Sequence, residues 1–339
     1  MTHVDTSNSR RRGRSHGRHG RHAKHGQYGQ YGQYGQARTQ LAIMRIATSW
    51  LALSLIAFSG MELSSGISLM QCCGPRPSRA EEAVSRDRLG AFVHTVRSPF
   101  QNGETRIRVL VPKAAESEAA DKPVAPRRVI YVLPVEAKDE RRYGDGLAEI
   151  HKLDLHNRHG VVFVAPEFSQ LPWYADHPTD DKVRQESYFI KSVVPLVEQR
   201  YRVQKTRDGR LLLGFSKSGW GAWTLLLRHP DLFERAAAWD APLMMDKPGK
   251  YGSGPIFGTD ENFAHYEVSR LVAEPARLPR DTTRLILTGY GNFRSEHQQV
   301  HALLEKSGTP HFYRDGPSLK HDWHSGWVSE AVELLLSKE

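Results

Sequence analysis

Ser216 lies in a sequence setting that suits an activated nucleophile. The stretch Leu211–Ala222 begins with three leucines, continues as Gly-Phe-Ser-Lys-Ser-Gly and becomes apolar again, which predicts a buried strand, a sharp turn and a helix. Such a turn holds a serine hydroxyl above the sheet and requires small residues two positions before and after it, here Gly214 and Ser218. The helix N-terminus favours developing negative charge, so the backbone N–H of Lys217 is the expected oxyanion donor. The chemistry would be nucleophilic attack by serine, and the alternative is an ordinary glycine- and serine-rich turn.

A nucleophilic serine needs a base, and two histidines are candidates. His321 and His324 both lie in the segment Lys-His-Asp-Trp-His-Ser-Gly-Trp, which follows the last apolar run before the C-terminal helix pattern. The chain contains 17 histidines, so position counts for more than residue type. Both could reach back to the serine, and the residues alone leave the choice between them open.

A carboxylate should orient the imidazole and stabilise its charged form. In a fold of alternating strands and helices with a serine turn, this carboxylate usually follows the penultimate strand, which is predicted here at 285–287. The segment after that strand contains Asn292, which carries no charge, and then Glu296. Glu296 is the first choice for the acid, so Glu296→Gln is expected to lower kcat about 10²–10⁴-fold. As a residue ahead of a predicted helix, however, it could equally serve as an N-terminal helix charge. Asp240, at the end of another apolar run, is the alternative, and the weaker candidates are Asp315 and Asp322.

Alternating apolar runs and helical patterns must position these residues. Helical patterns lie at 189–201, 219–227, around 303–304 and at 331–336, and Gln-Asn-Gly-Glu at 101–104 predicts a hairpin. Continuous apolar runs typical of strands buried on both faces occupy 129–133, 161–165, 211–213, 236–239 and 285–287. The alternation predicts an α/β fold with a mostly parallel central sheet and helices on both faces.

Four segments between residues 100 and 339 carry a family resemblance. A serine turn, the helix after it and a P-x-x-F segment are matched by GFSKSGWGAWTLLLRHPDLF. The helix that precedes the serine turn is matched by QESYFIKSVVPLVEQRY. SQLPWYADHP, with Trp173, Tyr174 and Asp176, is similar to a Trp/Tyr/Asp loop, and KHDWHSGW to an H-[DS]-W-x-x-W end. Together they resemble the putative-esterase family of α/β hydrolases, which includes esterase D (S-formylglutathione hydrolase), enterochelin and feruloyl esterases, and the mycolyltransferases.

This resemblance implies an α/β-hydrolase fold and assigns roles to individual residues. It implies Ser216 as the nucleophile and His321, the first histidine of its motif, as the base. Esterase D-like members place the acid where this chain has Asn292, whereas mycolyltransferases place a glutamate a few residues later, closer to Glu296. The identity of the acid therefore stays open.

The reaction that the resemblance implies is hydrolysis of a carboxylic ester through an acyl-enzyme on Ser216. The resemblance also places a second oxyanion N–H just after the first central strand, at Val135 or Glu136, to act beside that of Lys217. Acyl transfer of the mycolyltransferase type, in which a sugar hydroxyl replaces water, shares every step up to the acyl-enzyme. A non-catalytic binding protein on a hydrolase scaffold is a further alternative, motivated by Asn292.

The predicted hydrolase domain, residues 88–339, follows two segments of other composition. Residues 1–43 form a basic tail rich in His, Arg, Gly and Gln, which is predicted to be disordered because it has so few aliphatic side chains. Residues 44–80 are predicted to be a signal peptide or membrane-anchoring segment with a linker. Their uncharged run 46–58 is shorter than the ~20 residues that span a bilayer but has the length of a signal-peptide apolar region. Export to the periplasm or outside the cell is therefore expected, and N-terminal sequencing of the mature protein would test it.

Charge and cysteine content restrict the partners. The formal charge is +9, but residues 1–45 hold nine basic residues against one acid and account for +8 of it. The folded domain is therefore nearly neutral and is not expected to bind nucleic acid; its expected partner is a small-molecule or carbohydrate ester. Cys72 and Cys73 are adjacent and build no disulfide framework, and no CxxC or HExxH spacing is present, so neither a metal nor a cofactor is predicted. The sequence leaves the substrate's identity and the oligomeric state open.

Overall fold

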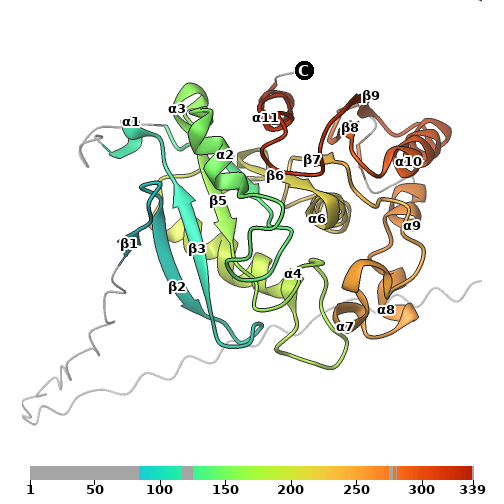
Figure 1. Cartoon of the computed structure of the whole chain (residues 1–339), viewed down its shortest axis with the longest axis horizontal. Coiled ribbons are helices and arrows are strands. Elements are labelled where there is room, and N and C mark those ends of the chain that lie inside the picture. The colour runs from blue at the N-terminus through green and yellow to red at the C-terminus, as the bar shows by residue number, and fades with distance from the viewer. Residues whose placement is uncertain (1–83, 117–124, 275–277, 280, 338–339) are drawn as a thin grey trace, which may run out of the picture. The chain divides into compact units, whose positions relative to one another are not determined.

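The structure of the protein is a computed structural model, and it describes residues 84–116, 125–274, 278–279 and 281–337 (Figure 1). The predicted tail at 1–43, the predicted export segment at 44–80 and both cysteines lie outside the described residues. Within the described part, no helix combines the length and the apolar character needed to cross a membrane.

A nine-stranded sheet forms the centre of the described part, in the order β1-β2-β3-β5-β4-β6-β7-β8-β9. Neighbours from β5 to β9 pair in parallel, and the pairs β1–β2, β2–β3 and β3–β5 are antiparallel. The strands are β1 (Ser85–Arg86), β2 (Phe92–Arg97), β3 (Glu104–Leu110), β4 (Val129–Val132), β5 (Val162–Pro166), β6 (Arg210–Phe215), β7 (Arg235–Trp239), β8 (Leu285–Tyr290) and β9 (His311–Ser318).

Helices cover both faces of this sheet, and each face has its own apolar core. One core includes residues of α4, α5, α6, α9 and α10, and the other includes residues of α2, α3 and α11 (Figure 1). A π-helical turn at 189–193 joins α4 to α5, and short 3₁₀ turns occupy 207–209 and 250–252. The helices are α1 (Lys113–Glu116), α2 (Gly146–Lys152), α3 (Leu155–His159), α4 (Gln185–Tyr188), α5 (Val194–Arg200), α6 (Ser216–Arg228), α7 (Gly254–Phe257), α8 (Asp260–Ala264), α9 (Val268–Ala273), α10 (Arg294–Ser307) and α11 (Val328–Leu336).

The predicted α/β architecture is confirmed. Each of the five predicted apolar runs forms a strand, β4 to β8, and the predicted hairpin joins β2 to β3. Two strands were missed: β9, which is mostly polar and lies at the edge of the sheet, and β1, which begins before residue 88 and pairs with β2.

Strand β6 shows why a continuous apolar run was needed here. Leu211 and Leu213 point into one core and Leu212 into the other, so every leucine side chain of the run is buried. At its carboxyl end, Phe215 pairs with Trp239 at the end of β7. The residues that follow these two strands therefore emerge side by side at the same edge of the sheet.

Candidate active site

Ser216 occupies a sharp bend between β6 and α6. Its φ is +53°, in the left-handed region that residues other than glycine seldom adopt. Its backbone N–H donates to the carbonyl oxygen of Asp240 at 3.1 Å, which ties the bend to the end of β7. The backbone therefore has the strained strand-to-helix turn that a nucleophile elbow requires.

Small neighbours make this bend possible. A Cβ on Gly214 would lie 2.2 Å from the carbonyl oxygen of Ser218, and a Cβ on Gly219 would lie 2.8 Å from the Cβ of Ala241. Ser218 itself is fully buried, and its hydroxyl donates to the carbonyl of Phe215 at 2.9 Å and accepts from the N–H of Phe215 at 3.1 Å. Serine in place of the usual glycine at this position thus adds two hydrogen bonds across the turn.

His321 contacts the Ser216 hydroxyl directly. Its Nε2 lies 3.0 Å from Ser216 Oγ, and its Nδ1 lies 2.6 Å from Asp240 Oδ2. An ionised carboxylate only accepts hydrogen bonds, so Nδ1 carries the proton and the lone pair of Nε2 faces the serine. The rings of Tyr143 and Phe215 pack edge-on against the imidazole, with centroids 5.2 and 5.0 Å away.

Asp240, the alternative acid of the sequence analysis, is the carboxylate beside the imidazole. Its side chain is fully buried, and it accepts backbone N–H groups from Asn292 at 2.7 Å and Phe293 at 2.8 Å. Burial raises the pKa of Asp240, but the hydrogen bonds from His321 and from the backbone after β8 outweigh burial, so the pKa lies below its usual range. Asn292 thus contributes its main chain to the carboxylate rather than a carboxylate of its own.

A second buried histidine supports the acid. His297 on α10 accepts the N–H of Ala241, the residue after Asp240, at 2.9 Å through Nε2. Burial lowers the pKa of His297 to about 4, so the ring is neutral and keeps this lone pair over the neutral pH range. This residue could not be identified from the sequence, because a histidine in the first turns of a helix carries no signal of its own.

The preferred acid, Glu296, does not contact His321. It accepts the N–H of Met244 at 2.8 Å, because α10 points its first turn toward the segment after β7. Burial raises the pKa of Glu296. The weaker candidates lie elsewhere: Asp315 pairs with Arg294, and Asp322 accepts the backbone N–H of His324.

His324, the other candidate base, has a different partner. Its Nδ1 lies 2.6 Å from Glu149 Oε2, and its Nε2 accepts the N–H of Asp145 at 3.3 Å. Glu149 is almost fully buried on α2. His324 therefore anchors the loop that carries His321 to the helix beside it.

Ser216 and His321 open into a cleft of about 750 Å³, within the range of small-molecule sites. Both predicted oxyanion residues, Lys217 and Glu136, line it. The remaining lining comes mostly from loops without a motif: Glu140, Arg141, Arg142, Tyr143, Leu171, Pro242, Tyr251, Gly252, Asn292 and Phe293.

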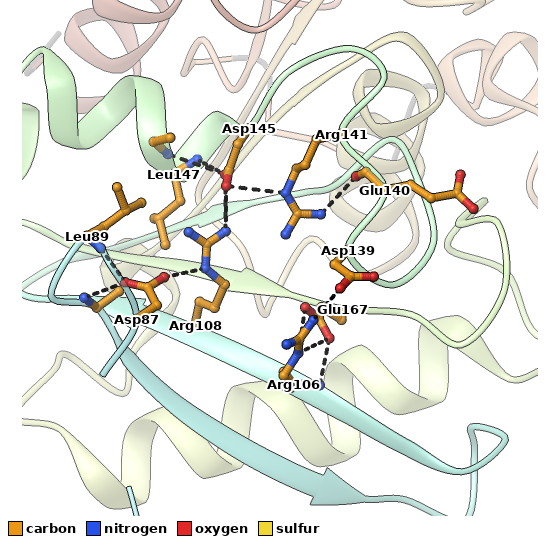
Figure 2. Close-up of polar contacts among 12 residues, drawn as sticks. Asp87, Leu89, Arg106, Arg108, Asp139, Glu140, Arg141, Asp145, Leu147 and Glu167 are labelled. Carbon is orange, nitrogen blue, oxygen red and sulfur yellow. Dashed lines mark hydrogen bonds and ion pairs between the residues drawn. The ribbon is translucent and has the colours of Figure 1, made fainter. Parts of the chain in front are cut away.

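Ion pairs hold the loop 136–145 that forms one wall of the cleft, and Figure 2 shows them. Arg108 on β3 is almost fully buried, and it reaches Asp87 and Asp145, each at 2.8 Å. Asp145 also accepts the N–H groups of Leu147 and Ala148 as the N-cap of α2. The end of the loop is therefore fixed to the sheet and to a helix.

The middle of the same loop has its own attachment. Arg106, two residues before Arg108 on β3, pairs with Glu167 at 2.9 Å and with Asp139 at 3.4 Å (Figure 2). Arg141 Nε lies 3.3 Å from Asp145, which links the loop's middle to its end. The segment that carries Glu136 is thus attached to β3 through Arg106 and Asp139.

The Trp/Tyr/Asp loop lines the cleft only through Leu171, and its residues Trp173, Tyr174 and Asp176 pack elsewhere. Tyr174 donates its hydroxyl to the carbonyl of Pro134 at 2.5 Å, and its ring lies so close to α6 that a Cβ on Gly221 would be 2.0 Å from it. Asp176 accepts the N–H and hydroxyl of Ser187. This loop therefore supports the strand end that leads to Glu136.

The comparison with known families agrees with the motifs. Residues 165–329 match the family model named Esterase and described as "Putative esterase". The resemblance stated from the sequence is thus confirmed, and the match supports ester hydrolysis. No curated protein matches the chain.

Solved structures show that the fold is that of α/β-hydrolase esterases. A ferulic acid esterase has a TM-score of 0.57 at 23% identity, covering 72% of this chain and 95% of its own. An S-formylglutathione hydrolase from Agrobacterium tumefaciens has a TM-score of 0.57 at 17% identity, covering 74% and 96%. MPT51 (FbpC1) of Mycobacterium tuberculosis has a TM-score of 0.54 at 14% identity, covering 71% and 96%.

Proposed function

Starting from the match of residues 165–329 to the esterase family, we propose that this protein is a serine esterase that hydrolyses carboxylic esters through an acyl-enzyme on Ser216. The observation that carries the proposal is the hydrogen-bonded chain from Ser216 through His321 to Asp240. A nucleophile, a base and an orienting carboxylate in this order are what acyl transfer requires.

In the acylation step, Ser216 Oγ attacks the ester carbonyl carbon and its proton passes to His321 Nε2. Asp240, kept ionised by its three hydrogen-bond partners, stabilises the imidazolium that forms. The negative charge on the former carbonyl oxygen is stabilised by the backbone N–H groups of Lys217 and Glu136, the two donors expected beside the nucleophile. The C–O bond then breaks, and the alcohol leaves with the proton from His321.

In the deacylation step, water replaces the alcohol. His321 takes a proton from the water, the hydroxide adds to the acyl carbon, and the acid product leaves as Ser216 regains its proton. The size of the cleft favours a small acyl ester or a sugar ester. The name of one structural relative, a ferulic acid esterase, supports a small-molecule ester as the substrate.

A fluorophosphonate probe and p-nitrophenyl esters test the proposal on the full chain. We predict that the wild type is labelled, that Ser216→Ala is not, and that Ser216→Ala loses turnover by about 10⁴-fold or more. Ser295→Ala is the matched control, because Ser295 is exposed at the start of α10 and does not line the cleft. Equal labelling of wild type and Ser216→Ala would exclude this serine, and a wild type that neither reacts nor turns over would contradict the esterase proposal.

The same assay separates the alternatives. With a sugar acceptor present, an acyltransferase would form acylated sugar in place of free acid, whereas an esterase releases the acid. The binding-protein alternative was motivated by the missing carboxylate at Asn292, and the position of Asp240 beside His321 supports catalysis instead.

A further inference from the structure

Among the described residues, one group of histidines and carboxylates has its ligand atoms close enough to hold a metal ion. It consists of His301 and Glu305, one turn apart on α10, and His311, the first residue of β9. His301 Nδ1 lies 2.7 Å from His311 Nε2, and Glu305 Oε1 lies 3.8 Å from the same nitrogen. The three ligand atoms all lie within 4.8 Å of one another.

The two rings are held in orientations that suit a metal. His311 Nδ1 lies 2.8 Å from the carbonyl of Thr309, which only accepts, so Nδ1 carries the proton and Nε2 presents its lone pair toward His301. Histidine ligands of metals commonly donate their second ring N–H to a backbone carbonyl in this way. The His311 ring is 3% exposed, and the His301 ring stacks on Tyr313 with a centroid distance of 4.1 Å.

We propose that His301, Glu305 and His311 bind a zinc-type divalent ion, with water as the fourth ligand. Ligand atoms about 2.0–2.1 Å from a tetrahedral zinc lie about 3.3 Å from each other, and the two measured separations fall on either side of that value. Two imidazoles and one carboxylate suit zinc better than magnesium or calcium, which prefer oxygen ligands only. His301 coordinates through Nδ1 once its proton moves to Nε2, so no net charge change is needed.

The site escaped the sequence analysis because its ligands come from two elements. His301 and Glu305 are spaced for one helix face, but the third ligand lies across a turn at the edge of the sheet, and neither CxxC nor HExxH spacing results. A bound ion would join α10 to β9. None of its three ligands lines the cleft with Ser216 and His321, so its role would be structural and independent of the ester chemistry.

Zinc titration of the full chain, stripped of metal by a chelator and dialysed, tests the site. By calorimetry we expect the wild type to bind one more zinc ion per chain than His311→Gln, and its melting temperature to rise with zinc by more than that of the variant. Histidines of the N-terminal tail are common to both proteins and cancel in the difference. Cobalt in place of zinc should give the visible absorption bands of a tetrahedral site in the wild type only.

Two further variants make the outcome decisive. Glu305→Gln alters an exposed side chain, so its fold should be kept while zinc affinity at this site falls at least about 10-fold. His265→Gln, an exposed histidine outside the group, is the matched control and should bind like the wild type. Equal stoichiometry and equal zinc-dependent stabilisation in wild type, Glu305→Gln and His311→Gln would overturn the proposal.

Discussion

Ser216 and Asp240 both adopt positive φ, +53° and +42°, at the ends of neighbouring strands. Left-handed backbone costs a residue with a side chain about 1–2 kcal/mol, and it persists where surrounding structure enforces it. Here the hydrogen bond from Ser216 N–H to the Asp240 carbonyl links the two bends, so each strained residue holds the other. Strain at both positions turns two side chains toward one imidazole.

The acid can be identified by paired substitutions. Asp240→Asn should lower kcat by about 10⁴-fold, because an amide in place of the carboxylate can no longer stabilise the His321 imidazolium or enforce its tautomer. Glu296→Gln should change kcat by less than about 10-fold, since the amide oxygen can still accept from Met244. Steady-state kinetics on a p-nitrophenyl ester measure both. A large loss in Glu296→Gln beside near-normal Asp240→Asn would reverse this assignment.

His297 should make stability depend on pH. Its pKa is lowered from 6.5 to about 4 in the folded protein, so the unfolded chain binds more protons between these values. The contribution of the neutral His297 ring to the free energy of unfolding is therefore complete above pH 6.5. It is lost progressively as pH falls toward 4, by on the order of 3 kcal/mol. Urea unfolding of wild type and His297→Gln at pH 7.5, 6 and 5 measures it. We expect the free energy of unfolding of the wild type, relative to that of the variant, to decrease as pH falls. A difference that stays constant with pH would show that His297 does not cause the pH dependence.

Site residues could be predicted from the sequence only where neighbours along the chain define the geometry. Ser216 could be predicted because the small and apolar residues that form its turn are adjacent in the sequence. His321 could be predicted because the residues of its motif lie within a few positions of it. The acid could not, because Asp240 and Glu296 both follow strands that end at the same edge of the sheet. Which carboxylate meets the imidazole depends on the path of the segment after β8, whose N–H groups bind Asp240.

At the scale of elements, β3 holds the segment 136–145 that forms one wall of the cleft. Arg106 and Arg108 alternate with apolar residues and so point to the same face of the strand. Both reach the segment 136–145 that carries Glu136 (Figure 2). An antiparallel strand remote from Ser216 thus holds the segment that carries a predicted oxyanion donor.

Arg108→Met should destabilise the protein by about 3 kcal/mol or more, because it leaves Asp87 and Asp145 without their buried counter-charge. It should also lower kcat/KM, since the loop loses its anchor at Asp145. Urea unfolding and ester kinetics measure the two effects.

A matched arginine shows whether burial is responsible. Arg97 also pairs with a carboxylate, Glu104, but both side chains are exposed, at 83% and 51%. Arg97→Met should therefore cost less than about 1 kcal/mol and leave kcat/KM unchanged. Equal destabilisation by the two substitutions would mean that burial does not make the ion pairs of Arg108 more stabilising than the exposed pair of Arg97.

Central strands were predictable from sequence, whereas edge elements were not. Strands β4 to β8 are buried on both faces, so their sequences are continuous apolar runs. Strand β9 lies at the sheet edge and has exposed Arg314 and Asp315, so neither apolar continuity nor strict alternation marks it. The short helices α7 and α8 have too few residues to show a helical period.

At the scale of the whole molecule, the segments that carry the proposed triad occupy a limited part of the chain. The family match at 165–329 contains Ser216, Asp240 and His321 but not the loop that carries Glu136. Export, which rests on residues 44–80 alone, is a separate proposal that N-terminal sequencing of the mature protein tests.

Under the proposed mechanism, separation along the chain has a consequence for when the hydroxyl of Ser216 becomes reactive. Its partner imidazole is 105 residues away in sequence, and that imidazole is 81 residues from the carboxylate. No local stretch can bring the three together, so a newly made or denatured chain carries only an ordinary alcohol and cannot attack esters. Recovered turnover after refolding would consequently report that the central strands have reached their correct neighbours, without any spectroscopic label.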